Sequence, residues 1–164
     1  MQSKLKSLSE LKSIAQSLKS SGKKLVTTNG VFDILHVGHV RYLSQAKSLG
    51  DILIVGINSD TSVRKIKGPE RPINPEQDRA EILSSLEPVD YILIFSEQTP
   101  VKWLSEIKPD IHVKGGDYTQ DKIIEKDVVE SSGGKIIILP LVKGKSTTGI
   151  LQKLTSSKPA LKNT

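Results

Sequence analysis

Two histidines, His36 and His39, stand three residues apart in the sequence HVGH and are the side chains best suited to chemistry in this chain. On a helix this spacing places both imidazoles on one face, close to the backbone N–H groups that lack partners in the first turn. Those groups and the helix dipole favour phosphate. Gly38, between the histidines, has no Cβ, so a triphosphate can approach the backbone closely. The pattern predicts a phosphate site.

Two other interpretations of the pair remain open. Histidines at this spacing can bind zinc, but the only other histidine is His112, so a carboxylate would have to complete the site. The pair can also cap a helix or fill polar gaps in the fold. Because the histidines follow a predicted strand and are flanked by glycines, we interpret them as a phosphate site and predict no metal site.

The composition narrows the possible function classes. The chain has 164 residues and no cysteine, which excludes a disulfide framework, a thiolate nucleophile and a cysteine-based zinc site. The net charge of +6 favours polyanions, but aromatic residues make up only 4% and the lysines are scattered, which argues against nucleic acid. The N-terminus has no continuous apolar core, so we expect a cytoplasmic protein without a membrane span.

Alternating strands and helices must position the histidines. Short apolar or β-branched runs predict five strands, at residues 24–28, 52–57, 89–95, 111–114 and 135–139. Helical periodicity and capping signals predict helices at 7–22, 36–49, 75–86, 100–107, 119–132 and 146–154. Residues 63–75, rich in Lys, Arg, Pro and Gly, are predicted to form a basic loop. This alternation is typical of an α/β fold, a Rossmann-like, doubly wound, five-stranded parallel sheet in three layers.

The expected organisation is a helix at residues 1–23 packed on a domain of residues 24–154, followed by a flexible tail at 155–164. In doubly wound sheets ligands bind at the carboxyl ends of the strands. Polar clusters follow four predicted strands and are therefore expected to face one crevice, at residues 29–39, 58–60, 114–118 and 143–148.

The stretch TNGVFDILHVGH resembles the signature of the HxGH nucleotidyltransferase superfamily. The similarity covers about residues 24–154 and continues through INSD at 57–60, RPINPEQDR at 71–79, VKGGDY at 113–118 and STT at 146–148. Together these motifs most closely resemble the heptose 1-phosphate adenylyltransferases, which occur alone or as the second domain of a bifunctional kinase/adenylyltransferase. The resemblance implies a homodimer that uses ATP, Mg²⁺ and a sugar 1-phosphate and forms ADP-heptose and pyrophosphate, a step toward the lipopolysaccharide inner core.

The resemblance and the predicted crevice together give candidate roles. A sugar phosphate oxygen is already ionised at neutral pH, so the reaction needs positioning and charge stabilisation rather than a general base. The candidate catalytic residues are His36, His39, Lys65 and Lys67. The candidate nucleotide-binding residues are Thr28, Asn29, Gly30, Phe32, Gly38, Arg79, Lys114, Ser146, Thr147 and Thr148. The candidate residues for the sugar phosphate are Asp33, Asn58, Asp60, Arg71, Gly115, Gly116, Asp117 and Tyr118. His112 and Trp103 are expected to be structural.

Three alternatives stay open on the sequence alone. A cytidylyltransferase acting on glycerol 3-phosphate or a similar phosphorylated alcohol would use the same phosphate site with CTP. A regulatory nucleotide-binding module would release no pyrophosphate, although the intact pair His36 and His39 argues against it. A nucleic-acid-binding protein would show a steep salt dependence of affinity.

Overall fold

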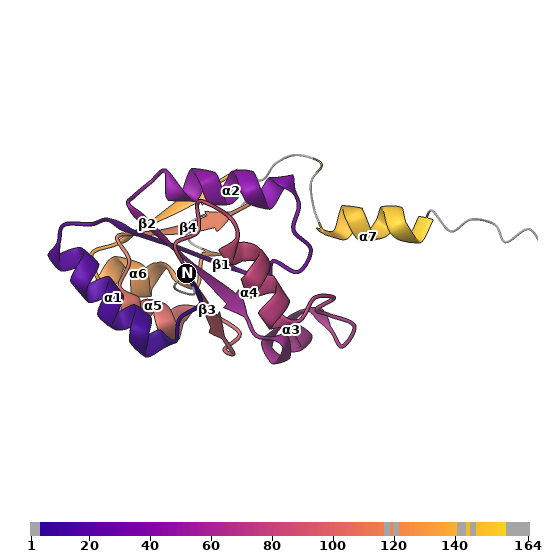
Figure 1. Cartoon of the computed structure of the whole chain (residues 1–164), viewed down its shortest axis with the longest axis horizontal. Coiled ribbons are helices and arrows are strands. Elements are labelled where there is room, and N and C mark those ends of the chain that lie inside the picture. The colour runs from indigo at the N-terminus through magenta and orange to yellow at the C-terminus, as the bar shows by residue number, and fades with distance from the viewer. Residues whose placement is uncertain (1–3, 117–118, 120–121, 141–143, 145–146, 157–164) are drawn as a thin grey trace, which may run out of the picture.

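A computed structural model describes residues 4–116, 119, 122–140, 144 and 147–156 (Figure 1). In this part of the chain five strands form one sheet in the order β3-β2-β1-β4-β5, and every neighbouring pair is parallel. The strands are β1 (Leu25–Gly30), β2 (Ile52–Asn58), β3 (Tyr91–Phe95), β4 (Ile111–Gly115) and β5 (Lys135–Leu139). The strand order reverses direction between β1 and β4. The predicted doubly wound α/β fold is confirmed.

Helices cover both faces of this sheet and make three layers (Figure 1). One face packs against α2 (Val37–Lys47) and α4 (Glu76–Ser84), and the other against α1 (Leu8–Ser20), α5 (Val101–Ile107) and α6 (Lys126–Ser131). Successive strand residues point to opposite faces, so Val26 and Leu25 enter different core clusters. Both faces are buried, and this explains the nearly uninterrupted apolar runs of the central strands.

The ends of α1 follow the predicted signals. Ser7 Oγ accepts a hydrogen bond from the Glu10 N–H, and the Glu10 carboxylate accepts one from the Ser7 N–H at 2.8 Å, which forms a capping box. Gly22, two residues past the helix, has a φ of 75°, which a glycine adopts without strain. Leu11 and Ala15 bury the apolar face of the helix against the sheet.

The predicted basic loop at residues 63–75 is wrong in its first part, because α3 (Asp60–Lys67) is a helix. Ser59 caps it, since its side chain accepts a hydrogen bond from the Ser62 N–H. Val63 is fully buried and anchors the helix, and the basic residues around it are good helix formers. Irregular backbone begins only at Gly68, where φ is 99°.

The predicted helix at residues 119–132 is also shorter in the structure. Residues 124 and 125 form a turn, and α6 begins at Lys126. Ile123 reaches the core from this non-helical segment, so an apolar residue that fitted the helical pattern is buried without a helix. At the other end of the chain, α7 (Thr147–Ser156) continues two residues past its predicted end, and the rest of the predicted tail lies outside the described residues. Figure 1 shows α7 extending away from the sheet, and none of its described residues is buried.

Trp103 and His112 fill the layer between α5 and the sheet, which confirms their structural role. Gly56 makes room for the indole, because a Cβ there would lie 2.6 Å from Trp103 Cζ2. The His112 ring meets the indole edge-on, and its Nδ1 lies 2.8 Å from Thr27 Oγ1. Burial, with a smaller contribution from Lys114, lowers the pKa of His112 to about 3.

Acid should therefore destabilise the fold through His112. In the unfolded chain this imidazole takes up a proton near its ordinary pKa of 6.5, whereas in the folded protein it stays neutral down to a pKa of about 3. Unfolding thus takes up a proton between these limits, and stability should fall by up to about 1.4 kcal/mol for each pH unit lost. Urea unfolding of the wild type and His112→Gln at pH 7.5 and 4.5 measures this effect. The variant should lose about 2 to 3 kcal/mol less on acidification, and parallel pH profiles would contradict the prediction.

Candidate active site

The strand order reverses between β1 and β4, and the predicted crevice lies at the carboxyl ends of these two strands. Ligands of doubly wound folds bind at this place. Lys114 Nζ, near the end of β4, lies 3.3 Å from Asn29 Oδ1, near the end of β1. The fold therefore brings together residues of two predicted clusters, 29–39 and 114–118, the second of which the structure describes up to Gly116.

His36 is the N-cap residue of α2. Its Nδ1 accepts a hydrogen bond from the Gly38 N–H at 3.1 Å. The capping interpretation is therefore true of His36, and it has a chemical consequence. Because Nδ1 is the acceptor, the neutral imidazole carries its proton on Nε2, and the capping bond fixes which nitrogen can donate.

His39 stacks on His36, with ring centroids 3.9 Å apart and 25° between the ring planes. Burial, and to a lesser degree His36, lowers the pKa of His39 to about 4, so this imidazole is neutral at pH 7. Its Nδ1 is buried and has no hydrogen-bond partner within the described ranges. The start of α2 thus combines the positive end of the helix dipole with an imidazole that can donate to an anion.

Phe32 packs against the His39 ring, and Gly30 packs against Phe32. Both residues were predicted nucleotide contacts. The Phe32 ring is buried, and its centroid lies 5.3 Å from that of His39. Phe32 has a φ of 49°, an uncommon value for a residue with a side chain, and such backbone is concentrated at functional sites. A Cβ at Gly30 would lie 2.9 Å from Phe32 Cε2, so only glycine lets the ring approach this closely.

Thr28 is fully buried behind the crevice rather than open to it. Its Oγ1 lies 2.7 Å from Tyr42 Oη and 3.0 Å from Val113 O, and Tyr42 Oη lies 3.0 Å from the same carbonyl. Burial raises the pKa of Tyr42, so its hydroxyl stays protonated. Tyr42 links α2 to β1 and β4. Sequence reasoning missed it, although it stands three residues after His39 and so shares a helix face with it.

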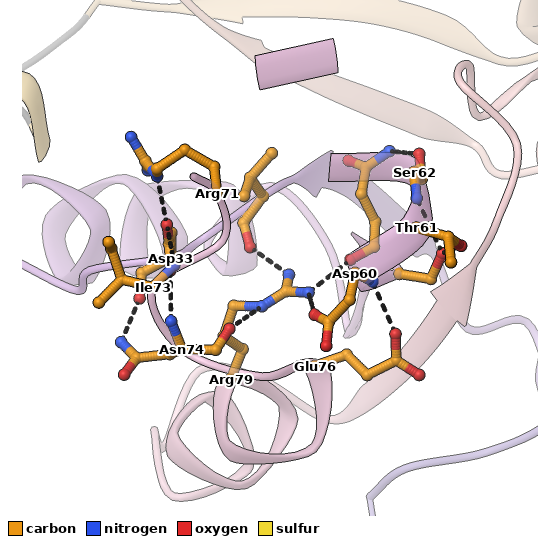
Figure 2. Close-up of polar contacts among 12 residues, drawn as sticks. Asp33, Asp60, Thr61, Ser62, Arg71, Ile73, Asn74, Glu76 and Arg79 are labelled. Atoms are coloured by element: carbon orange, nitrogen blue, oxygen red, sulfur yellow. Dashed lines mark hydrogen bonds and ion pairs between the residues drawn. The ribbon is translucent and has the colours of Figure 1, made fainter. Parts of the chain in front are cut away.

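The guanidinium of Arg79 is buried and ties α4 to the ends of β1 and β2 (Figure 2). It donates to Asn74 O at 3.0 Å, Val31 O at 2.7 Å, and both Asn58 O and the Asp60 carboxylate at 2.8 Å. These contacts favour a positioning role for Arg79 over the predicted direct contact with triphosphate. The same bonds hold Asn58 and Asp60, two predicted ligands of the sugar phosphate, against the Arg79 guanidinium.

Asp33 anchors the segment that follows Gly68 (Figure 2). Its carboxylate is buried and accepts hydrogen bonds from Arg71 Nε at 2.7 Å, the Ile73 N–H at 2.9 Å and the Asn74 N–H at 2.8 Å. Burial opposes ionisation, but these bonds outweigh it and lower the pKa of Asp33. The predicted sugar-binding pair Asp33 and Arg71 is thus an ion pair within the protein, and sequence reasoning missed the structural part played by Asn74.

The other predicted site residues lie at the edge of the crevice or beyond the described ranges. Thr147 Oγ1 donates to Ile34 O at 3.3 Å, which places the start of α7 beside the loop before α2. Gly116 extends the pairing of β4 with β5, since its N–H donates to Leu139 O at 3.1 Å. The exposed or partly exposed predicted residues are Lys65, Lys67, Gly115 and Thr148. The predicted residues that fall outside the described ranges are Asp117, Tyr118 and Ser146.

A family model described as Cytidylyltransferase-like matches residues 27–144, a span that includes the histidines, the Arg79 contacts and the crevice. The chain belongs to the cytidylyltransferase-like family. This confirms the expected placement among the nucleotidyltransferases.

Individual relatives agree with the family. The bifunctional protein HldE of Geotalea uraniireducens is 50% identical over 151 residues, which cover 92% of this chain and 31% of the relative. The chain thus spans about a third of the length of the curated relatives it matches. The crystal structure of a lipopolysaccharide core biosynthesis protein from Thermoplasma volcanium is 32% identical, with a TM-score of 0.63, and covers 76% of this chain and 100% of that one. A pantoate-beta-alanine ligase from Francisella tularensis, 19% identical with a TM-score of 0.57, shares the fold over 92% of this chain and 76% of its own.

Replacing Arg79 should destabilise this cytidylyltransferase-like domain. In Arg79→Met three carbonyls and the Asp60 carboxylate lose their donor in a buried place, so we expect a loss of about 3 to 5 kcal/mol. Arg79→Lys should recover little of this lost stability, because one ammonium cannot reach acceptors that surround the planar guanidinium. Urea unfolding at pH 7 measures the loss, with the exposed Arg41→Met as control at less than about 0.5 kcal/mol. A loss in Arg79→Met as small as that of the control would contradict the assignment.

Proposed function

We propose that the chain is an adenylyltransferase that transfers AMP from ATP to D-glycero-β-D-manno-heptose 1-phosphate and releases pyrophosphate. The match to HldE proteins at about 50% identity carries the proposal. These relatives are named bifunctional, and the chain matches about a third of their length. Because the chain belongs to the cytidylyltransferase-like family, we assign nucleotidyl transfer to the third of the relatives that it matches. The Thermoplasma relative is named a lipopolysaccharide core biosynthesis protein, which supports a reaction on a sugar of that core. ADP-heptose would be the product.

The site supports an in-line displacement at the α-phosphorus. An oxygen of the sugar phosphate forms the new bond to phosphorus, the bond to the β-phosphate oxygen breaks, and the electron pair leaves with pyrophosphate. The dipole at the start of α2 and the donors of His36 and His39 would stabilise the charge that gathers on the leaving group. Contact with phosphate would favour the protonated form of His39, so its capacity to donate would increase as charge develops.

The magnesium ion is proposed to arrive with ATP as part of the substrate. Asp33 and Asp60, carboxylates near the crevice, are engaged by Arg71 and Arg79. Across the described ranges no group of three or more His, Asp or Glu side chains is arranged to hold a metal ion. Lys65 and Lys67, exposed on the last turn of α3, are proposed to approach the triphosphate of this complex.

The partners and setting of the enzyme stay predictions. We propose a homodimer and a cytoplasmic location, with no role for nucleic acid or a membrane. None of the described helices is both long and apolar enough to span a bilayer. A cytidylyltransferase acting on glycerol 3-phosphate is not favoured, because the HldE relatives cover 92% of the chain.

The decisive experiment is a pyrophosphate-release assay that crosses ATP and CTP with heptose 1-phosphate and glycerol 3-phosphate. We expect turnover with ATP and heptose 1-phosphate and its loss in excess chelator, because magnesium screens the triphosphate. Preference for CTP or for glycerol 3-phosphate would defeat the proposal.

His39→Asn should separate the catalytic role of His39 from a structural one. Losing a donor to charge that develops in the transition state typically lowers turnover about 10²- to 10³-fold, whereas ATP affinity should change much less. A purely structural residue at this position would cost about 1 kcal/mol or less of stability and leave the single-turnover rate nearly intact. Melting temperature, ATP affinity and single-turnover rate are measured in parallel, with exposed Gln45→Ala on the same helix as control. A near-normal rate in His39→Asn would sink the catalytic assignment.

A further inference from the structure

Glu125 is a buried carboxylate at a position where a helix would use a cap. It is the N-cap residue of α6, yet its side chain makes no capping hydrogen bond. The residue is only 5% exposed, and its Oε1 accepts a hydrogen bond from Lys114 Nζ at 2.8 Å. The side chain therefore bonds to Lys114 on β4 and does not cap its own helix.

Lys114 lies at the reversal of strand order, in the crevice of the candidate site. Its ammonium donates to the Glu125 carboxylate and to the amide oxygen of Asn29 at 3.3 Å. The strand β1 and the residue before α6 thus each contribute an acceptor. Its side chain is 17% exposed, so the described part of the protein does not fully enclose it. A charge this far from water is stable only when it is paired, so Glu125 fixes where the ammonium stands.

The two ends of the crevice consequently treat an anion differently. At α2 the neutral His39 has a buried Nδ1 that makes no hydrogen bond within the described part of the chain. At Lys114 an incoming anion has to compete with a carboxylate already 2.8 Å from the ammonium. A phosphate group therefore gains more at the histidine end.

We propose that Glu125 is a positioning residue that sets the anion selectivity of this crevice. By cancelling the charge of Lys114, it directs phosphate groups to α2 and keeps the Lys114 end for an uncharged part of a ligand. Without Glu125 the ammonium would become a second phosphate site, since charge pairs away from bulk water attract strongly. The inference rests on the proposed function only in taking pyrophosphate as the product that must not be retained.

Binding of inorganic pyrophosphate, measured by isothermal titration calorimetry, tests the proposal without any turnover. Glu125→Gln keeps the shape of the side chain but removes its charge, so we expect pyrophosphate to bind about tenfold more tightly. Glu125→Asp, which keeps the charge, should stay closer to the wild type. The matched control is Glu130→Gln, an exposed glutamate of the same helix, with no change expected. Unchanged or weaker binding in Glu125→Gln overturns the proposal.

A double variant keeps the test decisive if Glu125→Gln folds poorly. Lys114→Met with Glu125→Gln removes both charges together and leaves neither one buried without a partner. Its pyrophosphate affinity should stay within about threefold of the wild type, because the pair contributes little net attraction. A tenfold loss would show that Lys114 itself binds phosphate, and would overturn the proposal. The calorimetry uses neither sugar phosphate nor ATP. Its result can therefore be interpreted even if the adenylyltransferase assay shows no turnover.

Discussion

The guanidinium of Arg79 has to find acceptors within the protein, because its side chain has no access to solvent. The acceptors come from three segments: the loop after β1, the junction of β2 with α3, and the turn before α4. A buried cation with incomplete partners is costly, so these segments are stable only in the arrangement that surrounds it. Asp33 adds a second buried charge nearby and holds the backbone of Ile73 and Asn74. Two buried ionic contacts thus fix one side of the crevice, and they do so with the residue types that the motif RPINPEQDR supplies.

The proposed phosphate site depends on how α2 is held against the same sheet. Tyr42 joins this helix to β1 and β4 through one hydroxyl, and the Phe32 ring, resting on Gly30, supports His39. Helix N-terminal N–H groups act at short range, so their value for a reaction lies in their position relative to the ligand. The sheet, Tyr42 and the unusual backbone at Phe32 therefore fix the position of the start of α2 relative to β1 and β4.

The sequence predicted the fold well because the fold follows from local patterns. Buried parallel strands read as apolar runs, and Ser7, Gly22 and Pro75 marked helix ends where the structure has them. The errors came where tertiary contacts decide. Lys65 and Lys67 looked like loop residues, but a cap at Ser59 and one buried Val63 make a helix of them.

For the candidate site, the residue types predicted which segments meet, but they did not predict which side chains bond to one another. Asp33, Arg71 and Arg79 were expected to contact substrate because charged residues in a motif usually do. Instead Arg71 pairs with Asp33, and Arg79 bonds to Asp60 and three carbonyls, across sequence separations of up to 48 residues. Glu125 gave no signal at all, since its partner is known only from the packing of α6 against the sheet.

These contacts imply a particular kind of electrostatic site. Among the described residues, three cations around the proposed site are paired within the protein, Arg79 with Asp60, Arg71 with Asp33 and Lys114 with Glu125, while burial keeps His39 neutral. A crevice lined with uncompensated cations would hold ATP and pyrophosphate alike, and binding both ground states tightly gives no acceleration. Fixed dipoles and neutral donors attract an anion less strongly at a distance, but they respond to charge that moves onto a correctly placed oxygen. The net charge of +6 is therefore a property of the whole chain, whereas at the proposed site selectivity for the transition state would depend on these cations being paired.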